Sequence, residues 1–413
     1  MLKKIPVDRL RVGMYLHGFE AAWLDHPFWR TRFVIGDPVD VERVRASAVR
    51  EVWIDVARGI DVAEPPDAAA APQPPVPAAV PAAQVVPVRG PSAPAPADSV
   101  PFDAELSQAA NVVRRSLGAV KSMFAEARLG KAIDGEVSAA VVDDIAASVW
   151  RNPTTLISVA RLKTADDYTY MHSVAVCALM VALARQLGLD AQRCRVAGMA
   201  GLLHDIGKAA MPLDVLNKPG RLSDAEFAVI KTHPERGWAM LREAGGADEV
   251  TLEVCLHHHE KIDGSGYPHG LAGDAITLYA RMGAVCDVYD AITSNRPYKA
   301  GWDPAESIAR MASWKDHFDT AVFAAFVKSL GIYPVGSLVR LKSQRLAVVV
   351  ESDPQRPTAP VVKAFYSLRQ QMPVAPERID LATSPREGIV GRESPNQWNF
   401  PYLDELWAGG AVR

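Results

Sequence analysis

The stretch VAGMAGLLHDIGK, from Val196 to Lys208, places adjacent His204 and Asp205 at the end of an apolar helical run. Burying an imidazole beside a carboxylate is costly unless both groups bind something, and a metal ion satisfies both. Adjacent residues cannot share one helix face. The pair therefore suits an aspartate that reaches between two metal ions while the histidine binds one. A single His-Asp pair is weak evidence, because many sequences carry one by chance.

Further histidines and aspartates recur at the ends of the neighbouring predicted helices. Seven of the ten histidines lie between His172 and His269. The recurring groups are His172 at a helix start, His233-Pro234 at a helix start or break, His257-His258-His259-Glu260 at a helix end, and Asp287 with Asp290 three residues on. Helical bundles build dimetal sites from side chains on facing helices, and mixed nitrogen and oxygen donors suit iron, manganese or zinc. The pattern therefore predicts a dimetal site in a helical domain.

Among the histidines from His172 onward, three are expected to lie outside this site. Taken alone, His257 is best interpreted as a solvated residue at a helix end. His269 and His317 are interpreted as structural residues, because neither belongs to a repeated pattern of this kind.

The N-terminal part of the chain is predicted to be a small module followed by a linker. Residues 1–62 contain strand-like runs at Val12–Leu16, Arg32–Ile35 and Val52–Val56 and a predicted helix over Asp40–Arg50, which indicates a small α+β module. The segment Pro65–Pro101 holds 12 of the 31 prolines. Such a segment buries too little to offset its ordering entropy, so residues 63–101 are predicted to form an extended linker. A docking site for another domain is the alternative.

Residues 102–330 are predicted to form an all-α domain, because no alternating strand pattern interrupts the helical periods. The predicted helices are Ala104–Ala127, Gly135–Val149, Val174–Leu187, Val196–Asp205, a helix opened by the capping box Ser223-Asp224-Ala225-Glu226, Val250–His258 and Leu278–Asn295. The first of them is explained equally well as a core helix and as a homodimer contact.

Residues 331–413 are predicted to form a small β appendage and a tail. Strand candidates are Ser337–Leu341, Leu346–Glu351 and Val361–Tyr366. From about residue 384 we expect a loosely ordered tail with aromatic anchors, which are Trp398, Phe400, Tyr402 and Trp407. The predicted fold class is therefore mainly α, with a small α+β module before the helical domain and a small β appendage after it.

Composition excludes several classes of protein. The 413 residues carry a net charge of −3, with 49% hydrophobic and 23% charged residues, as in an ordinary soluble domain. Near-neutral charge offers no electrostatic case for binding a nucleic acid polymer or a membrane surface. No uninterrupted apolar run reaches the ~18 residues of a membrane span, and the N-terminus lacks a signal-peptide pattern. The four cysteines have no CxxC spacing. We therefore expect a cytoplasmic protein with reduced, buried thiols.

Taken together, these motifs resemble the HD-GYP family of the HD superfamily, bacterial phosphodiesterases that open cyclic di-GMP. The resemblance rests on His172, His204-Asp205-x-Gly-Lys208, His233-Pro234, the eleven-position motif HHExxDGxGYP from His258 to Pro268, Asp287-x-x-Asp290 and Arg296-Pro297-Tyr298-Lys299. It covers about residues 130–330, and the eleven-position motif is highly specific. Residues 1–62, including Gly13-Met14-Tyr15 and Trp23–Phe33, resemble an uncharacterised segment often found ahead of HD-GYP domains.

The resemblance implies a site for two divalent metal ions, usually iron or manganese. The implied ligands, with Asp205 bridging, are His172, His204, Asp205, His233, His258, His259 and Asp287. Some relatives bind a third ion through a glutamate about one helical turn before the first histidine, and here the position four before His172 is Tyr168. We therefore expect two ions. Because each ligand position that can be placed holds a ligand-type residue, we expect an active enzyme.

Further roles follow from this resemblance and from phosphodiester chemistry. A hydroxide bridging the two metal ions would attack phosphorus, with Asp205 and Lys208 as the catalytic residues. Lys208, Arg296 and Lys299 would contact phosphate oxygens. Tyr267 would contact substrate or a partner protein, or only support its loop. Asp290 would orient a metal ligand or pair with Arg296.

The leading functional hypothesis is a cyclic di-GMP phosphodiesterase of bacterial second-messenger signalling that yields linear pGpG, with further hydrolysis to GMP left open. A second hypothesis is a low-turnover sensor or adaptor. It would bind a cyclic dinucleotide, or a diguanylate cyclase, through the Gly266-Tyr267-Pro268 loop. A third keeps the enzyme but changes the substrate to a hybrid cyclic GMP-AMP.

Overall fold

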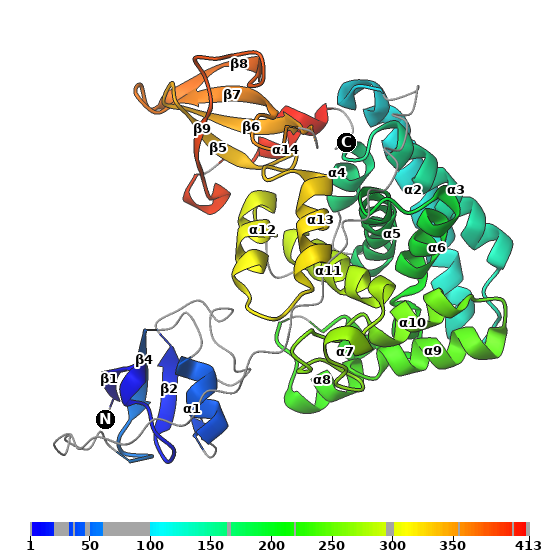
Figure 1. Cartoon of the computed structure of the whole chain (residues 1–413), viewed down its shortest axis with the longest axis vertical. Helices are drawn as coiled ribbons and strands as arrows, with labels where there is room; N and C mark the ends of the chain where they lie inside the picture. Colours follow the sequence, from blue (N-terminus) through cyan, green and yellow to red (C-terminus); the bar gives the residue numbers. More distant parts are fainter. Residues whose placement is uncertain are drawn as a thin grey trace, which may run out of the picture. The chain divides into compact units, whose positions relative to one another are not determined.

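The structure is a computed structural model that describes residues 2–19, 33–35, 38–45, 50–60, 100–162, 167–218, 220–294, 301–353, 356–398 and 400–409. The chain divides into two compact units, Met1–Pro87 and Val88–Arg413, and each is described here by itself (Figure 1). Most of the predicted proline-rich linker, and the aromatic residues Trp23, Phe28 and Trp29, lie outside the described residues.

The first unit contains an antiparallel sheet with strand order β1-β4-β2-β3. Its elements are β1 (Leu2–Pro6), η1 (Val7–Arg9), β2 (Tyr15–Phe19), β3 (Phe33–Val34), α1 (Pro38–Arg45) and β4 (Glu51–Asp55). Val52 and Ile54 of β4 are buried while Glu51 is exposed, so one face of the sheet carries the core. The predicted α+β module is confirmed. Strand β1 was not predicted, because only Ile5 of its five residues is buried, as expected of an edge strand.

The second unit begins with a run of helices. They are α2 (Phe102–Arg128), α3 (Gly135–Arg151), α4 (Thr155–Arg161), α5 (Tyr168–Gln186), α6 (Ala191–Leu203), η2 (Ile206–Ala210), α7 (Leu213–Leu216), α8 (Asp224–Ile230), α9 (His233–Ala244), α10 (Glu249–His257), η3 (Gly273–Ala275), α11 (Leu278–Thr293), α12 (Pro304–Ser313) and α13 (Thr320–Leu330). The mainly α fold class is confirmed, and the capping box is present at Ser223 and Glu226.

Helix α5 is the centre of this unit (Figure 1), and every residue from Met171 to Ala184 is buried. It packs against α3, α4, α6, α11 and α13, while α2 covers α3, α4 and α5. A helix that is apolar on all sides belongs in a core. Among the described residues, α5 alone is long and apolar enough to cross a membrane, but 78% of its most apolar 18-residue stretch is buried inside the protein.

A second antiparallel sheet follows, with strand order β8-β7-β6-β5-β9. Its strands are β5 (Leu338–Leu341), β6 (Arg345–Glu351), β7 (Val361–Ser367), β8 (Met372–Asp380) and β9 (Ile389–Arg392), followed by η4 (Pro395–Gln397) and α14 (Leu403–Ala408). The sheet is joined to the helices. Arg161 donates a hydrogen bond to Val335 O (3.0 Å), and Leu338 N donates to Asp303 Oδ2 (2.9 Å). Phe102 of α2 shares a hydrophobic cluster with β6 and α14.

The expectation of a loosely ordered tail from about residue 384 was wrong. Strand β9 pairs with β5, and α14 buries Trp407. The predicted aromatic anchors explain this order, because Trp398, Phe400 and Tyr402 pack around Phe365 and Tyr366 of β7. Aromatic rings bury large apolar areas, so a few of them are enough to order a short segment.

Two glycines on α6 set its close approach to α5. A Cβ atom on Gly201 would lie 2.9 Å from Val176 O and 3.0 Å from Cys177 Cα, and one on Gly198 would lie 2.8 Å from a Val181 methyl carbon. Because α6 ends at the His-Asp pair, the spacing between these two helices also fixes where His204 lies relative to His172.

The Gly201→Ala variant is expected to lose about 1–3 kcal/mol of unfolding free energy, since the added methyl group forces backbone apart. Gly118→Ala is the matched control. Gly118 lies in the middle of α2 with open space around its Cα, so this change should add about 0.5–1 kcal/mol through helix propensity. Urea unfolding of the two variants measures both values. Changes of the same sign and size in the unfolding free energies of the two variants would contradict the close approach of α6 to α5.

Candidate metal centre

Five helices deliver the side chains of the candidate site. His172 lies in the first turns of α5, and Asp287 and Asp290 lie on α11. His204 caps the C-terminus of α6, with Asp205 next in the turn before η2. His233 begins α9 ahead of Pro234, and His258 and His259 follow the end of α10. All the predicted ligand residues are buried except His259, which is partly exposed.

Gly207 lets η2 pack directly on α9, which brings Asp205 to His233. A Cβ atom at Gly207 would overlap the carbonyl oxygen of His233 and lie 2.5 Å from Gly237 N. The glycine of the His-Asp-x-Gly-Lys motif is therefore required by backbone contact rather than by its own φ angle.

One group of candidate ligands consists of His172, His204 and Asp287, whose ligand atoms lie within 4.8 Å of one another. Asp287 Oδ1 is 2.9 Å from His172 Nε2 and 4.0 Å from His204 Nε2. The two Nε2 atoms are 3.3 Å apart.

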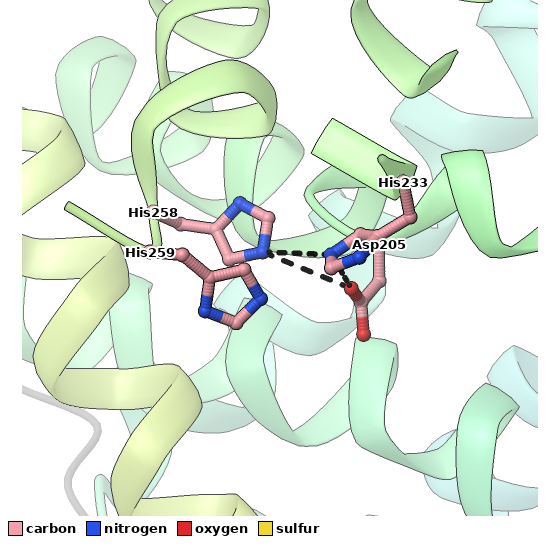
Figure 2. Close-up of side chains that lie close together, drawn as sticks. All are labelled: Asp205, His233, His258 and His259. Carbon is pink, nitrogen blue, oxygen red and sulfur yellow. Dashed lines mark hydrogen bonds and ion pairs between the residues drawn. The ribbon is translucent and has the colours of Figure 1, made fainter. Parts of the chain in front are cut away.

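The other group consists of Asp205, His233, His258 and His259 (Figure 2). Asp205 Oδ1 is 3.0 Å from His233 Nε2 and 3.8 Å from His258 Nε2, and these two nitrogens are 3.3 Å apart. Figure 2 shows the rings of His258 and His259 side by side, with His233 and Asp205 facing them. The two groups together contain all seven of the predicted ligand residues.

Asp205 lies between the two groups. Its Oδ1 faces His233 and His258, while its Oδ2 is 3.4 Å from His204 Nε2 and 3.5 Å from His172 Nε2. Asp287 also contacts both groups of ligands. Its Oδ1 lies beside His172, and its Oδ2 is 3.5 Å from His259 Nδ1. Two carboxylates thus join two clusters of imidazoles, which is the arrangement that a pair of bridged cations needs.

Hydrogen bonds at Nδ1 direct Nε2 of His204, His233 and His258 into the site, while Nε2 of His172 meets Asp287 Oδ1 at 2.9 Å. Nδ1 of His204, His233 and His258 donates to the carbonyl oxygens of Gly201, Ile230 and Val254 at 2.7–2.9 Å. Nδ1 of His172 donates to Asp290 Oδ2 at 2.6 Å. Such bonds fix the ring orientation and raise the basicity of metal-binding histidines. Asp290 therefore lies where a residue that orients His172 should lie.

The residues fit a metal ion. With their Nδ1 protons donated outward, the neutral rings of His233 and His258 direct two nitrogen lone pairs at each other across 3.3 Å. Asp205 Oδ1 is buried and accepts no hydrogen bond. Facing lone pairs and an unsatisfied buried carboxylate oxygen are unfavourable without a cation between them. Imidazole nitrogen with carboxylate oxygen is a donor set for a transition metal.

The carboxylates of the site favour their ionised forms, and His258 and His259 favour their neutral forms. Burial opposes the charged form of His172, but its hydrogen bonds to Asp287 and Asp290 raise its pKa. Burial alone would raise the pKa of Asp205, but Lys208 and the imidazole of His204 hold it well below its usual range. Burial also opposes ionisation of Asp287, but the hydrogen bond to His172 keeps its pKa low. Burial lowers the pKa of His258 well below its usual range and that of His259 to about 3. Deprotonated ligands of both kinds are the forms that bind metal.

The structure describes two of the four predicted substrate residues, Lys208 and Tyr267. Lys208 Nζ makes an ion pair with Asp205 Oδ2 and remains partly exposed. The Tyr267 ring stacks on His259, with centroids 4.6 Å apart. Arg296 and Lys299 lie outside the described residues.

The interpretation of His257 as a solvated residue was wrong. His257 is buried, with Nε2 3.0 Å from Nδ1 of His269 and Nδ1 3.1 Å from Glu253 Oε2. It points away from the His258–His259 pair because successive residues at a helix end face different directions. The four cysteines are buried and unpaired, as predicted.

Glu260 is a residue whose role the sequence did not reveal. Its buried carboxylate accepts hydrogen bonds from His269 N (2.7 Å) and Leu271 N (3.0 Å), on the far side of the Gly-Tyr-Pro turn. Gly266 packs against the same segment, since a Cβ there would lie 2.5 Å from Lys261 N. Glu260 and Gly266 thus hold Tyr267 against His259. The position of Glu260 within the HHExxDGxGYP motif is the sequence signal that could have indicated this role.

Comparisons with known proteins agree with the geometry. Residues 149–322 match the family described as HD domain, and residues 2–137 match a domain of unknown function, DUF3391. A cyclic di-GMP phosphodiesterase of Pseudomonas aeruginosa is 53% identical over 99% of this chain and 96% of its own length.

Two further relatives match a smaller part of this chain. A cyclic di-GMP phosphodiesterase response regulator of Xanthomonas campestris is 47% identical over 31% of this chain and 34% of its own length. A 3′3′-cGAMP-specific phosphodiesterase of Vibrio cholerae is 37% identical over 40% of this chain and 38% of its own length. With its metal-type site, its Gly-Tyr-Pro turn and a relative similar over the full length, this chain belongs to the HD-GYP family of HD-domain phosphodiesterases.

Proposed function

We propose that this protein hydrolyses cyclic di-GMP to linear pGpG. The observation that carries the proposal is the placement of Asp205 between two clusters of imidazole nitrogens. The Pseudomonas relative, similar over almost the whole of both chains, supports cyclic di-GMP as the substrate. A relative that acts on 3′3′-cGAMP is less similar and matches a smaller part of this chain.

The proposed cofactors are two divalent metal ions, iron or manganese. His172, His204 and Asp287 would hold one ion, His233, His258 and His259 the other, and Asp205 would bind both. Tyr168 supports two ions rather than three, because its phenol ring stacks on the His172 ring at 6.0 Å and offers no carboxylate there. Bound divalent ions would polarise a phosphoryl oxygen and lower the pKa of water.

The chain's own residues position the substrate and balance its charge. Lys208 makes an ion pair with Asp205, and with the carboxylate bound to metal its ammonium would turn to a phosphate oxygen. Asp290 holds His172 in one orientation. Tyr267 closes one wall of the site over His259, and Arg296 and Lys299 are proposed to bind phosphate from the segment after α11.

A partner-binding role for the Gly-Tyr-Pro loop remains a separate prediction. Tyr267 packs against a candidate metal ligand, so the substrate side is the better supported role for this ring. Binding of a diguanylate cyclase, formation of a homodimer and location in the cytoplasm remain predictions. For α2, the burial of its apolar face against α3, α4 and α5 supports the interpretation as a core helix.

Asp205→Asn is expected to reduce cyclic di-GMP turnover at least about a thousandfold, because the change removes the carboxylate shared by both groups. The measurement is release of pGpG by protein reconstituted with Mn²⁺ or anaerobically with Fe²⁺. Asp214→Asn, an exposed change on α7, is the matched control and should retain full activity. Undiminished turnover by the Asp205 variant would disprove the assignment.

Metal content provides an independent test of the two-group site. We expect about two ions per wild-type chain and about one after His204→Gln, because that change affects one group alone. His317→Gln is the control, since His317 lies outside both groups. Elemental analysis after gel filtration gives the ratios. One ion in the wild-type chain, or unchanged content in the His204 variant, would contradict the model of two groups.

Lys208→Met is expected to lower kcat on cyclic di-GMP about a hundredfold, as removal of one charge-stabilising donor does in other enzymes. Metal content should stay the same, because the lysine itself is not a ligand. Lys208→Arg should recover part of the rate. Steady-state kinetics together with metal analysis distinguish this result from loss of the site, which would lower both quantities.

A further inference from the structure

Lys231 is a second lysine close to the candidate site. It lies between α8 and α9, two residues before His233. Its Nζ is 5.8 Å from the centre of the Tyr267 ring and 5.4 Å from that of Phe227. Tyr267 in turn stacks on His259. Lys231 therefore lies one aromatic ring away from the candidate metal ligands.

The ammonium group of Lys231 is exposed, and no carboxylate pairs with it in the part of the chain that the structure describes. Lys208 and Lys218 differ in this respect. Lys208 pairs with Asp205, and Lys218 pairs with Glu226 on the same helical segment as Lys231. Two aromatic faces hold the side chain of Lys231 while leaving its hydrogen-bond donors free for a ligand.

Lys208, which pairs with a carboxylate, and Lys231, which does not, match the chemistry of the proposed substrate. A cyclic dinucleotide has two phosphodiester groups, of which one is cleaved. The cleaved group must lie at the Asp205 centre, within reach of Lys208. The other group lies across the same small ring, so it must meet the protein a few ångströms farther along the wall of the site. The wall at that distance on the His259 side is Tyr267, with Lys231 beyond it.

We propose that Lys231 binds the phosphate of the cyclic dinucleotide that is not cleaved, and so makes the site selective for a ligand with two phosphates. This inference rests on the function proposed above. An ammonium group is a compact point charge with three donors, which suits a phosphate oxygen better than a guanine edge. The cation–π contacts of its Nζ with Tyr267 and Phe227 hold the ammonium group near this wall and so lower the entropy lost on binding.

The test compares two substrates that differ in the second phosphate. Cyclic di-GMP has it, and bis(4-nitrophenyl) phosphate is a diester with a single phosphorus. For Lys231→Met we expect the KM for cyclic di-GMP to rise about tenfold or more, with kcat within about twofold of wild type, since one charge-assisted hydrogen bond is lost. The kinetics of bis(4-nitrophenyl) phosphate should not change.

Two variants serve as controls. Lys231→Arg retains the charge and should hold KM for cyclic di-GMP within about threefold of wild type. Lys131→Met removes an exposed lysine from the α2–α3 connection and should change neither substrate's kinetics. Metal content and thermal unfolding of all variants should match wild type.

Each result that differs from these expectations has one interpretation. If Lys231→Met lowers activity equally on both substrates, the residue only supports Tyr267, and the inference is overturned. If it changes neither, the inference is also overturned while the proposed function stands. A wild-type protein that cleaves the small diester but not cyclic di-GMP would instead overturn the proposed function itself.

Discussion

The buried carboxylate of Asp205 is the group on which the arrangement of the site depends. It is almost fully enclosed, and its two oxygens face different pairs of imidazoles. A buried carboxylate without compensation is strongly unfavourable. Lys208 and the surrounding imidazoles supply that compensation, and they keep the carboxylate ionised. The ionised carboxylate, with its Oδ1 accepting no hydrogen bond, is what a pair of cations would bind.

The helices around this carboxylate are held at short distances by residues without side chains. Gly198 and Gly201 bring α6 onto α5, and Gly207 brings η2 onto α9. Protein interiors transmit small displacements because they are close-packed. A shift of one of these helices would therefore separate His204 from His172, or Asp205 from His233, and change the geometry of both groups of ligands.

A second layer of contacts orients the ligands from outside. The carbonyl oxygens at the ends of α6, α8 and α10 accept the Nδ1 protons of three histidines, and Asp290 accepts that of His172. Glu260 holds the turn that carries Tyr267. Gly201 and Ile230 lie in the last turns of their helices, where backbone carbonyls lack partners within the helix. The carbonyl of Val254 also accepts a hydrogen bond from His258 N. Backbone groups near helix ends thus become part of the site.

Much of the site was predictable because ligand chemistry is carried by residue type. The spacing of His172, His204-Asp205, His233 and His258-His259 indicated a dimetal site in helices, and the structure brings those side chains together. His257 shows the limit of this reasoning. It has the same chemistry as its neighbours, but the end of α10 turns it toward His269. The order of the C-terminal tail was missed for a related reason, since Trp398 and Phe400 are ordered only by their contacts with β7.

The amino-acid sequence by itself determined the helical class and indicated a metal site, because periodicity and residue chemistry are local properties. The set of seven candidate ligands followed from the resemblance of the motifs to the HD-GYP family. The tertiary structure alone decided which ligands share a group and that Lys231 lies behind Tyr267. These relations join residues far apart in the chain, and their distances depend on how closely α5, α6, α9, α10 and α11 pack.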